Sequence, residues 1–107
     1  MSYSIYAECK HCGNNILDEL RCHSYTYTIS PMLYDVGINP SEWKQTPATE
    51  VIVQLRMGID KLLSDPQKYR AMNPENGWGD YDSMLKEWLI PIFEQLKKYP
   101  ETLVSTC

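Results

Sequence analysis

Two cysteines at close spacing are the side chains with the most defined chemistry in this sequence. Cys9 and Cys12 are separated by two residues and followed by Gly13. A turn of this kind directs two thiolates at one point, and the glycine lets neighbouring amides approach the sulfur atoms. The spacing therefore indicates half of a tetrahedral zinc site.

A complete zinc site needs four ligands, so two more side chains must come from elsewhere in the chain. Cys22 and His23 are the first candidates, with His11 and Cys107 as further options. Cys22 and His23 are adjacent and would face opposite sides of a strand, and a second pair of cysteines at the same spacing is missing. The same residues therefore have three interpretations: a structural zinc ion, unpaired reduced thiols, or a redox pair.

A second candidate site is the block at residues 73–81, which places Trp78 between two glycines and lies between two predicted helices. Trp and Tyr rings stack on planar ligands, and asparagine side chains supply hydrogen-bond specificity. This loop is expected to form a binding site together with the segment Tyr25–Met32. The candidate ligand-binding residues are Tyr27, Thr28, Met32, Asn73, Glu75, Asn76, Trp78 and Tyr81.

The alternative interpretation of this block is a structural corner. Asp80 and Asp82 fill the first turn of the next predicted helix, where carboxylates satisfy free amides and repel phosphate. Trp78 would then be buried, and Asn73, Asn76 and Tyr81 would present polar groups on the surface. The cations available for a charged ligand are Arg21, Arg56, Lys68 and Arg70.

Catalytic chemistry has weaker support in the sequence. His11 and His23 both flank cysteines, which makes them metal-ligand candidates rather than general bases. Glu75 and Asp80 are available carboxylates, but nothing fixes their spacing, and no set of nucleophile, base and orienting group is visible. We therefore predict no catalytic residues and favour a protein that is not an enzyme. The runner-up is a small hydrolase or transferase that uses the cleft beside Trp78.

Size and charge exclude several classes of protein. The chain has 107 residues and predicts a single domain, β-rich over residues 1–30 and mainly helical over 31–107. The net charge is −4, without the cluster of Lys and Arg that phosphate backbones attract, and no apolar run approaches the roughly 20 residues of a membrane span. We therefore expect neither a nucleic-acid partner nor a membrane partner. The sequence also starts without the basic and apolar regions of a signal peptide, which predicts a cytoplasmic protein with reduced cysteines.

Hydrophobic periodicity predicts an α+β fold, in which a small antiparallel sheet packs against two main helices and one or two short ones. Alternating residues predict strands at 2–8, 15–22, 24–30 and 102–106. Ser30 and Thr46 each precede a proline, as an N-cap precedes a first-turn proline. These devices predict a short helix at 32–36 and a long one at 47–64.

Two further helix starts follow in the sequence. Asp65–Pro66 begins another short helix, and Asp80 is the expected N-cap of the last helix, at 81–99. Pro91 lies inside that helix and should kink it. Gly58 lies inside the helix at 47–64, where close packing of another element would explain a residue that costs about 1 kcal/mol relative to alanine.

Apolar residues at helical spacing define the predicted buried face of each long helix. Leu55 and Leu85 lie in the middle of these faces. The first face is formed by Ala48, Val51, Ile52, Leu55, Ile59, Leu62 and Leu63. The second is formed by Tyr81, Leu85, Trp88, Leu89, Ile92, Leu96 and Tyr99.

Three stretches of the chain resemble a widespread family of small bacterial and phage proteins of unassigned function. They are the segment Tyr25–Met32, which runs Thr-x-x-x-x-x-Met from Thr26, the segment Asp65–Arg70, and the block Asn-Pro-x-Asn-Gly-Trp-Gly-x-Tyr at 73–81. The resemblance covers roughly residues 25–104. Relatives carry Thr-His-Asn where this chain has Thr26, Tyr27 and Thr28, so this chain lacks the histidine that would serve there as a base or ligand.

The resemblance implies a cytoplasmic, phage-encoded protein, located in the host cytoplasm. Small phage proteins without catalytic residues are often inhibitors of host systems, an analogy at the level of the class. We therefore hypothesise a non-enzymatic binding protein that inhibits host antiviral defence by sequestering a small signalling molecule or blocking a defence protein. Its partner would be a small polar or planar ligand, or a host protein, and an oligomer is compatible with the sequence. The third alternative is a zinc-stabilised protein-interaction module, and zinc is the one cofactor that the sequence suggests.

Overall fold

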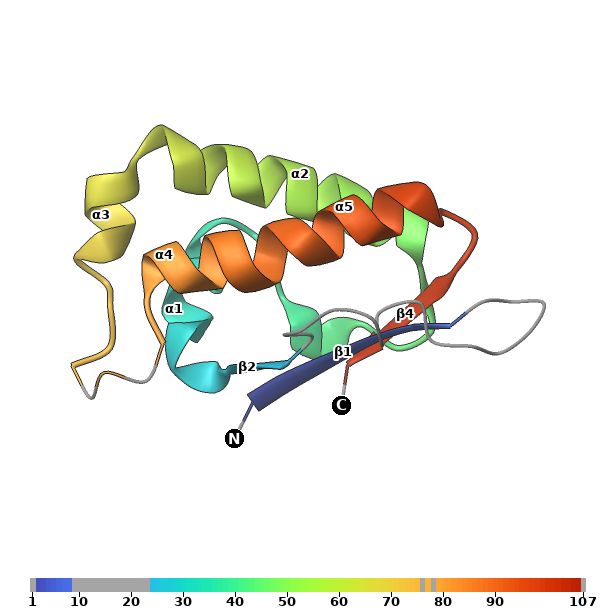
Figure 1. Ribbon diagram of the computed structural model, residues 1–107, viewed down its shortest axis with the longest axis horizontal. Coiled ribbons are helices and arrows are strands. Elements are labelled where there is room, and N and C mark those ends of the chain that lie inside the picture. The colour runs from blue at the N-terminus through green and yellow to red at the C-terminus, as the bar shows by residue number, and fades with distance from the viewer. Residues whose placement is uncertain (1, 9–23, 76, 78, 107) are drawn as a thin grey trace.

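The fold is the α+β arrangement that the sequence predicts. The computed structural model describes residues 2–8, 24–75, 77 and 79–106, and only the backbone of Ser2 and Tyr27. An antiparallel sheet of four strands, in the order β2-β1-β4-β3, forms one layer, and helices α2 and α5 lie side by side over it (Figure 1). The strands are β1 (Ser2–Glu8), β2 (Ser24–Thr26), β3 (Thr46–Pro47) and β4 (Leu103–Thr106).

Strand β1 joins the two halves of the sheet. Its first residues pair with β2, where Tyr3 lies opposite Tyr25, and its last residues pair with β4. Tyr3, Ile5 and Ala7 are buried, which confirms the alternation predicted for this strand. The strand predicted at 102–106 is confirmed as β4.

The strand predicted at 24–30 is wrong beyond Thr26. The chain continues as a 3₁₀ helix, η1 (Tyr27–Ile29), and then as α1 (Ser30–Asp35). Pro31 favours this change because its fixed φ suits a first helical turn and it needs no amide partner. Ser30 is not the N-cap either, because its Oγ lies 2.6 Å from the Tyr3 hydroxyl. The strand predicted at 15–22 falls outside the described residues.

The N-cap predicted at Thr46 is also wrong. Thr46 and Pro47 form β3, paired with β4, and Thr46 Oγ1 accepts a hydrogen bond from the Lys44 amide at 3.2 Å. The long helix α2 (Ala48–Ser64) therefore begins without a side-chain cap. The Ala48 amide donates instead to the carbonyl of Thr102, the residue before β4, at 2.9 Å, so a backbone carbonyl replaces the missing cap.

Helix α2 buries the face predicted for it, with one exception. Leu55 and Leu62 are fully buried, whereas Leu63 is 56% exposed and lies outside the buried face. Gly58 is explained as predicted, because a Cβ added there would lie 2.3 Å from Ile38 Cδ1. The missing side chain lets the segment after α1 pack directly on the helix backbone.

The last helical stretch has three parts: α4 (Tyr81–Ser83), the π-helical η3 (Met84–Leu89) and α5 (Ile90–Lys98). Pro91 has no amide to donate, and its ring crowds the carbonyl four residues earlier. The π-helical turns lie directly before it, as is common where a helix absorbs such a defect. Leu85 and Trp88 are buried as predicted, whereas Tyr99 is 48% exposed and wrongly assigned to the buried face.

Two short helices complete the chain: η2 (Pro40–Glu42) and α3 (Pro66–Arg70). The short helix predicted after Asp65 is α3, and Asp65 caps it by accepting a hydrogen bond from the Lys68 amide at 3.4 Å. The core lies between the sheet and the long helices, with Trp88 at 0% exposure as its largest fully buried side chain. In the part of the chain that the structure describes, no helix is long and apolar enough to cross a membrane.

Candidate functional site

Two segments that the sequence assigns to one site meet in the structure. Tyr25 of β2 contacts Asp80, which lies 55 residues further along the chain: the Asp80 amide donates to the Tyr25 hydroxyl at 3.2 Å. The same hydroxyl forms a hydrogen bond with Ser83 Oγ. Tyr25 therefore attaches β2 to the start of α4.

Gly79 makes this contact possible. Its φ is +84°, in the left-handed region that favours glycine. A Cβ at this position would lie 2.8 Å from Thr26 Cγ2 and 2.9 Å from Tyr25 Cε1. Both the backbone conformation and the close approach of β2 therefore require a residue without a side chain.

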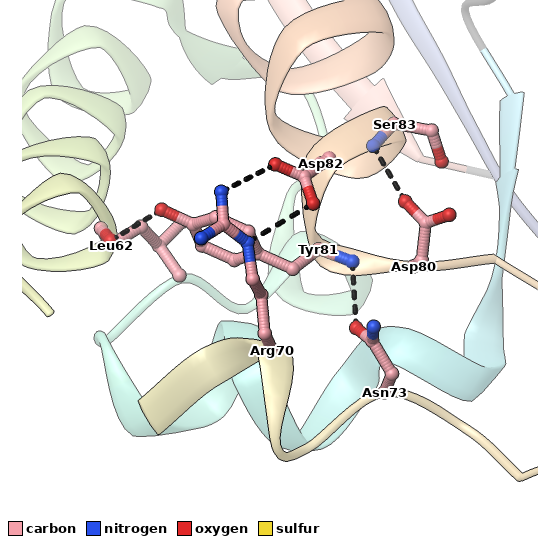
Figure 2. A network of polar contacts seen from close by, with 7 residues as sticks. All are labelled: Leu62, Arg70, Asn73, Asp80, Tyr81, Asp82 and Ser83. Carbon is pink, nitrogen blue, oxygen red and sulfur yellow. Dashed lines mark hydrogen bonds and ion pairs between the residues drawn. The ribbon is translucent and has the colours of Figure 1, made fainter. Parts of the chain in front are cut away.

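The two ends of the 73–81 loop are joined directly. Asn73 Oδ1 accepts a hydrogen bond from the Tyr81 amide at 2.8 Å, and Asp80 Oδ1 accepts one from the Ser83 amide at 2.7 Å (Figure 2). The second bond confirms Asp80 as the N-cap of the last helical stretch. We call residues 73–81 the anchored loop, because its base is fixed on both sides.

Tyr81 is a buried anchor of this loop, which confirms its place in the predicted buried face and corrects the expectation that it presents a polar group on the surface. Its side chain is 2% exposed, and its hydroxyl donates to the Leu62 carbonyl of α2 at 2.6 Å (Figure 2). Its ring stacks on Tyr69 of α3, with centroids 6.3 Å apart. Burial raises the pKa of Tyr81 above its ordinary value of 10.0, so the hydroxyl stays a neutral donor. The ring has no open face for a planar ligand on the surface.

An ion pair connects α3 to α4 beside this anchor. Arg70 Nε and one terminal nitrogen donate to the two carboxylate oxygens of Asp82 at 3.2 and 2.9 Å (Figure 2). The guanidinium also lies over the Tyr81 ring, 5.4 Å from its centroid. The hydrogen bonds from Arg70, and then its charge, hold the pKa of Asp82 below its ordinary 3.8. Arg70 is thus engaged with Asp82 and does not face a ligand site as a free cation.

A second ion pair connects α3 to α1. Lys68 Nζ lies 2.9 Å from Asp35 Oδ2, which also accepts from the Tyr69 hydroxyl at 2.8 Å. The hydrogen bonds from Lys68 and then Tyr69 lower the pKa of Asp35 below its ordinary 3.8. Desolvation, followed by the bond to Asp35, raises the pKa of Tyr69 above its ordinary 10.0. Lys68, like Arg70, is therefore already neutralised by a carboxylate.

The lowered pKa values of Asp35 and Asp82 predict how the free energy of unfolding depends on pH. A carboxyl whose folded pKa lies below its unfolded value stabilises the fold above the unfolded pKa, and this contribution is lost as pH falls through the folded pKa. For Asp35 and Asp82 that loss begins near the ordinary value of 3.8 and continues below it. Urea unfolding between about pH 5 and about pH 2 should therefore show a shallower loss of stability in Asp35→Asn and Asp82→Asn than in the wild type.

Asp60→Asn is the matched control for this experiment. Asp60 is exposed on α2, and the described residues offer it no ion pair. It should therefore keep the pH dependence of the wild type. Equal pH dependence in all three variants would contradict the stabilising role of the two ion pairs.

The tip of the anchored loop is open to solvent at its described residues. Glu75 and Gly77 are both exposed. Gly77 has a φ of +74°, and a Cβ added there would meet no atom within 4 Å. The contrast with Gly79 shows that the loop is packed at its base and free at its tip.

The other predicted binding residues are distributed differently. Met32 is fully buried in the core, so its side chain is not accessible to a surface ligand, which corrects its assignment to the site. Thr28 is half-buried. Asn76, Trp78 and the side chain of Tyr27 lie outside the described residues, and their predicted roles stay predictions.

The predicted zinc ligands also fall outside the described residues. They are Cys9, Cys12, Cys22 and His23. Among the residues that are described, no three His, Cys, Asp or Glu side chains gather closely enough to hold a metal ion. Zinc binding therefore stays a prediction from the cysteine spacing.

Sequence reasoning missed the long-range contacts that fix the loop and α3 to the rest of the protein. Tyr25 was assigned to the binding segment, but its contact with Asp80 and Ser83 depends on packing between distant elements. Asp35 carries no local signal, because its partners lie 33 and 34 residues away. Arg70 and Asp82 are closer, at a separation of 12 residues across the loop. Their opposite charges on either side of the glycine-rich block were the one available signal.

No protein-family model, no curated protein and no solved structure matches this chain.

Proposed function

We propose that this chain is a non-enzymatic binding protein, and that its recognition surface is the tip of the anchored loop together with the adjoining end of β2 and η1. The observation that carries the proposal is the contrast within the loop. Its base is fixed by Asn73, Asp80 and Tyr25, whereas Glu75 and Gly77 at its tip are exposed.

A fixed base with an exposed tip favours binding because it lowers the entropic cost of association. A loop that is ordered before it meets a partner does not have to be ordered during binding. Binding residues are also disproportionately found on loops that a rigid scaffold positions. The hydrogen bonds of Asn73 and Asp80, and the buried hydroxyl of Tyr81, supply that scaffold here.

The charged groups around the loop support binding over catalysis. A catalytic acid or base has to reach a substrate atom. Asp35, Lys68, Arg70 and Asp82 instead form two ion pairs that hold α3 against α1 and α4. Their pKa values move in the direction that keeps each group charged, as suits a structural ion pair.

The physiological role that we propose follows from the class of proteins that the sequence resembles. That role is the inhibition of antiviral defence by a phage-encoded protein in the host cytoplasm. It would act by sequestering a small signalling molecule or by blocking a defence protein. The exposed loop tip offers a surface for either kind of partner.

The test is to identify what co-purifies with the wild-type protein and with a loop variant. Small molecules released by denaturation, stoichiometric protein partners and bound metals are measured by mass spectrometry on the same preparation. Glu75→Ala changes an exposed side chain at the tip and should preserve the thermal melt. We expect it to reduce the co-purified compound or partner at least about tenfold, as loss of a central contact does.

Glu101→Ala is the matched control. Glu101 is exposed, as Glu75 is, but it follows α5 and lies away from the loop. It should retain the bound species at the wild-type level. Equal retention by both variants would place the binding surface elsewhere. Sustained multiple turnover of the bound compound by the wild-type protein would reject the non-enzymatic proposal in favour of the hydrolase or transferase alternative.

A further inference from the structure

Helix α3 is too short to be stable by itself. It has five residues, Pro66–Arg70, well below the roughly 12 residues at which isolated helices become even marginal in water. Its cap is weak, since the Asp65 oxygen lies 3.4 Å from the Lys68 amide. Its position must therefore come from contacts with the rest of the protein.

Those contacts are of three kinds. One is the stack of Tyr69 on Tyr81, in which both side chains are buried. Another is the pair of ionic contacts, Lys68 with Asp35 of α1 and Arg70 with Asp82 of α4. Asp35 also accepts a hydrogen bond from the Tyr69 hydroxyl at 2.8 Å, so the helix is held by one aromatic contact, two ion pairs and this hydrogen bond.

The ionic contacts lie where salt can reach them. The side chains of Lys68 and Asp35 are 51% and 39% exposed, and those of Arg70 and Asp82 are 50% and 46% exposed. Each such exposed pair contributes little to stability and weakens with ionic strength. Such energies are small against global unfolding, but they are large against the local opening of a five-residue helix.

We infer that α3 is a salt-sensitive latch, which opens locally while the rest of the fold stays closed and thereby loosens one side of the anchored loop. The loop begins at Asn73, three residues after the end of α3, and its other end is held independently by the contact of Tyr25 with Asp80. Opening of α3 therefore leaves the Asn73 side held only by its bond to the Tyr81 amide and leaves the Tyr25 side in place. The claim that the latch regulates the binding surface rests on the proposed function. The claim that α3 opens locally does not.

Hydrogen exchange measured by mass spectrometry tests the latch on the free protein, without any partner. The reporting amides are those of Ala71, Met72 and Asn73, which donate to the α3 carbonyls of Gln67, Tyr69 and Arg70. The variant is the double substitution Asp35→Asn with Asp82→Asn, which keeps the shape of both side chains and removes both charges. At low salt, the reporting amides should exchange about tenfold faster in this variant than in the wild type, equivalent to about 1.4 kcal/mol.

The second part of the experiment varies the salt concentration. In about 1 M sodium chloride, where the Debye length is about 3 Å, exchange of the same amides in the wild type should approach the rate in the variant. The variant itself should respond little to salt. Peptides from α5 should keep their protection under all conditions, and Asp60→Asn should behave as the wild type.

Two results would overturn the inference. If the reporting amides are unaffected by both the substitutions and salt, the two ion pairs do not hold α3. If they change only in step with the α5 peptides, the ion pairs stabilise the whole fold and not a local latch. Because no partner is present, neither result bears on the binding surface, which the comparison of Glu75→Ala with Glu101→Ala tests separately.

Discussion

Replacing Trp88 with alanine is expected to lower the free energy of unfolding by about 3–5 kcal/mol, as emptying a large aromatic site in a core usually does. Trp88 is 0% exposed. Its ring stacks on Tyr3 of β1 at 6.2 Å and on Tyr25 of β2 at 5.5 Å between centroids. A domain of this size has only ~5–15 kcal/mol of stability, so the variant should be close to unfolding at room temperature. Urea denaturation followed by circular dichroism measures the change.

Trp88→Phe separates packing from hydrogen bonding at this position. The Trp88 indole nitrogen has no hydrogen-bond partner among the described residues, so phenylalanine should lose volume but no bond. It should therefore recover most of the stability that alanine removes. Trp43 offers a comparison, because its indole nitrogen donates to Gln54 at 3.1 Å. A cost for Trp88→Phe equal to that of Trp88→Ala would contradict the packing explanation.

The parts of the fold that were predictable from sequence are those that local periodicity determines. The alternation of Tyr3, Ile5 and Ala7 needs only a strand with one buried face. Helix α2 follows from apolar residues at helical spacing, and its errors occur at the edge of the buried face, as for Leu63. The loss of Tyr99 from the second buried face has the same origin, since it follows the last residue of α5.

The errors at the ends of elements have a tertiary cause. Thr46 and Pro47 have the residue types of a helix start, but pairing with β4 uses them as a strand. Ser30 has the residue type of an N-cap, but its hydroxyl bonds to Tyr3 across the core. In both cases a long-range contact competes with the local capping preference, and a sequence read locally does not contain that contact.

The residues of the candidate site also divide into those that local sequence predicts and those whose position depends on tertiary contacts. The cap at Asp80 could be predicted, because it depends on neighbouring residues. The need for glycine at position 79 could not, because it depends in part on the close approach of Tyr25 and Thr26. The burial of Tyr81 was also predicted from its helical spacing, but its partners Leu62 and Tyr69 were not, and the burial of Met32 was not, because these depend on tertiary packing. The spacing of aromatic and amide side chains therefore singled out the 73–81 loop. It did not separate the residues that anchor the loop from those that face solvent.

The two glycines of the anchored loop provide a matched test of its fixed base. Gly77 and Gly79 have similar backbone angles, with φ of +74° and +84°. Alanine at either position should cost about 1–2 kcal/mol for the left-handed conformation alone. They differ in their surroundings, because a Cβ at Gly77 meets no atom within 4 Å, whereas one at Gly79 would lie 2.8 Å from Thr26 and 2.9 Å from Tyr25.

Gly79→Ala should therefore cost about 1–3 kcal/mol more than Gly77→Ala, the usual penalty for overpacking. The new methyl group cannot be accommodated cheaply, since Tyr25 is held by Trp88 and by its bonds to Asp80 and Ser83. Thermal and urea unfolding of the two variants give this difference directly, and Gly37→Ala, at a φ of +83° in open space, repeats the control outside the loop. Equal costs at Gly77 and Gly79 would mean that Tyr25 yields freely, and the loop would then lack the fixed base on which its proposed binding role depends.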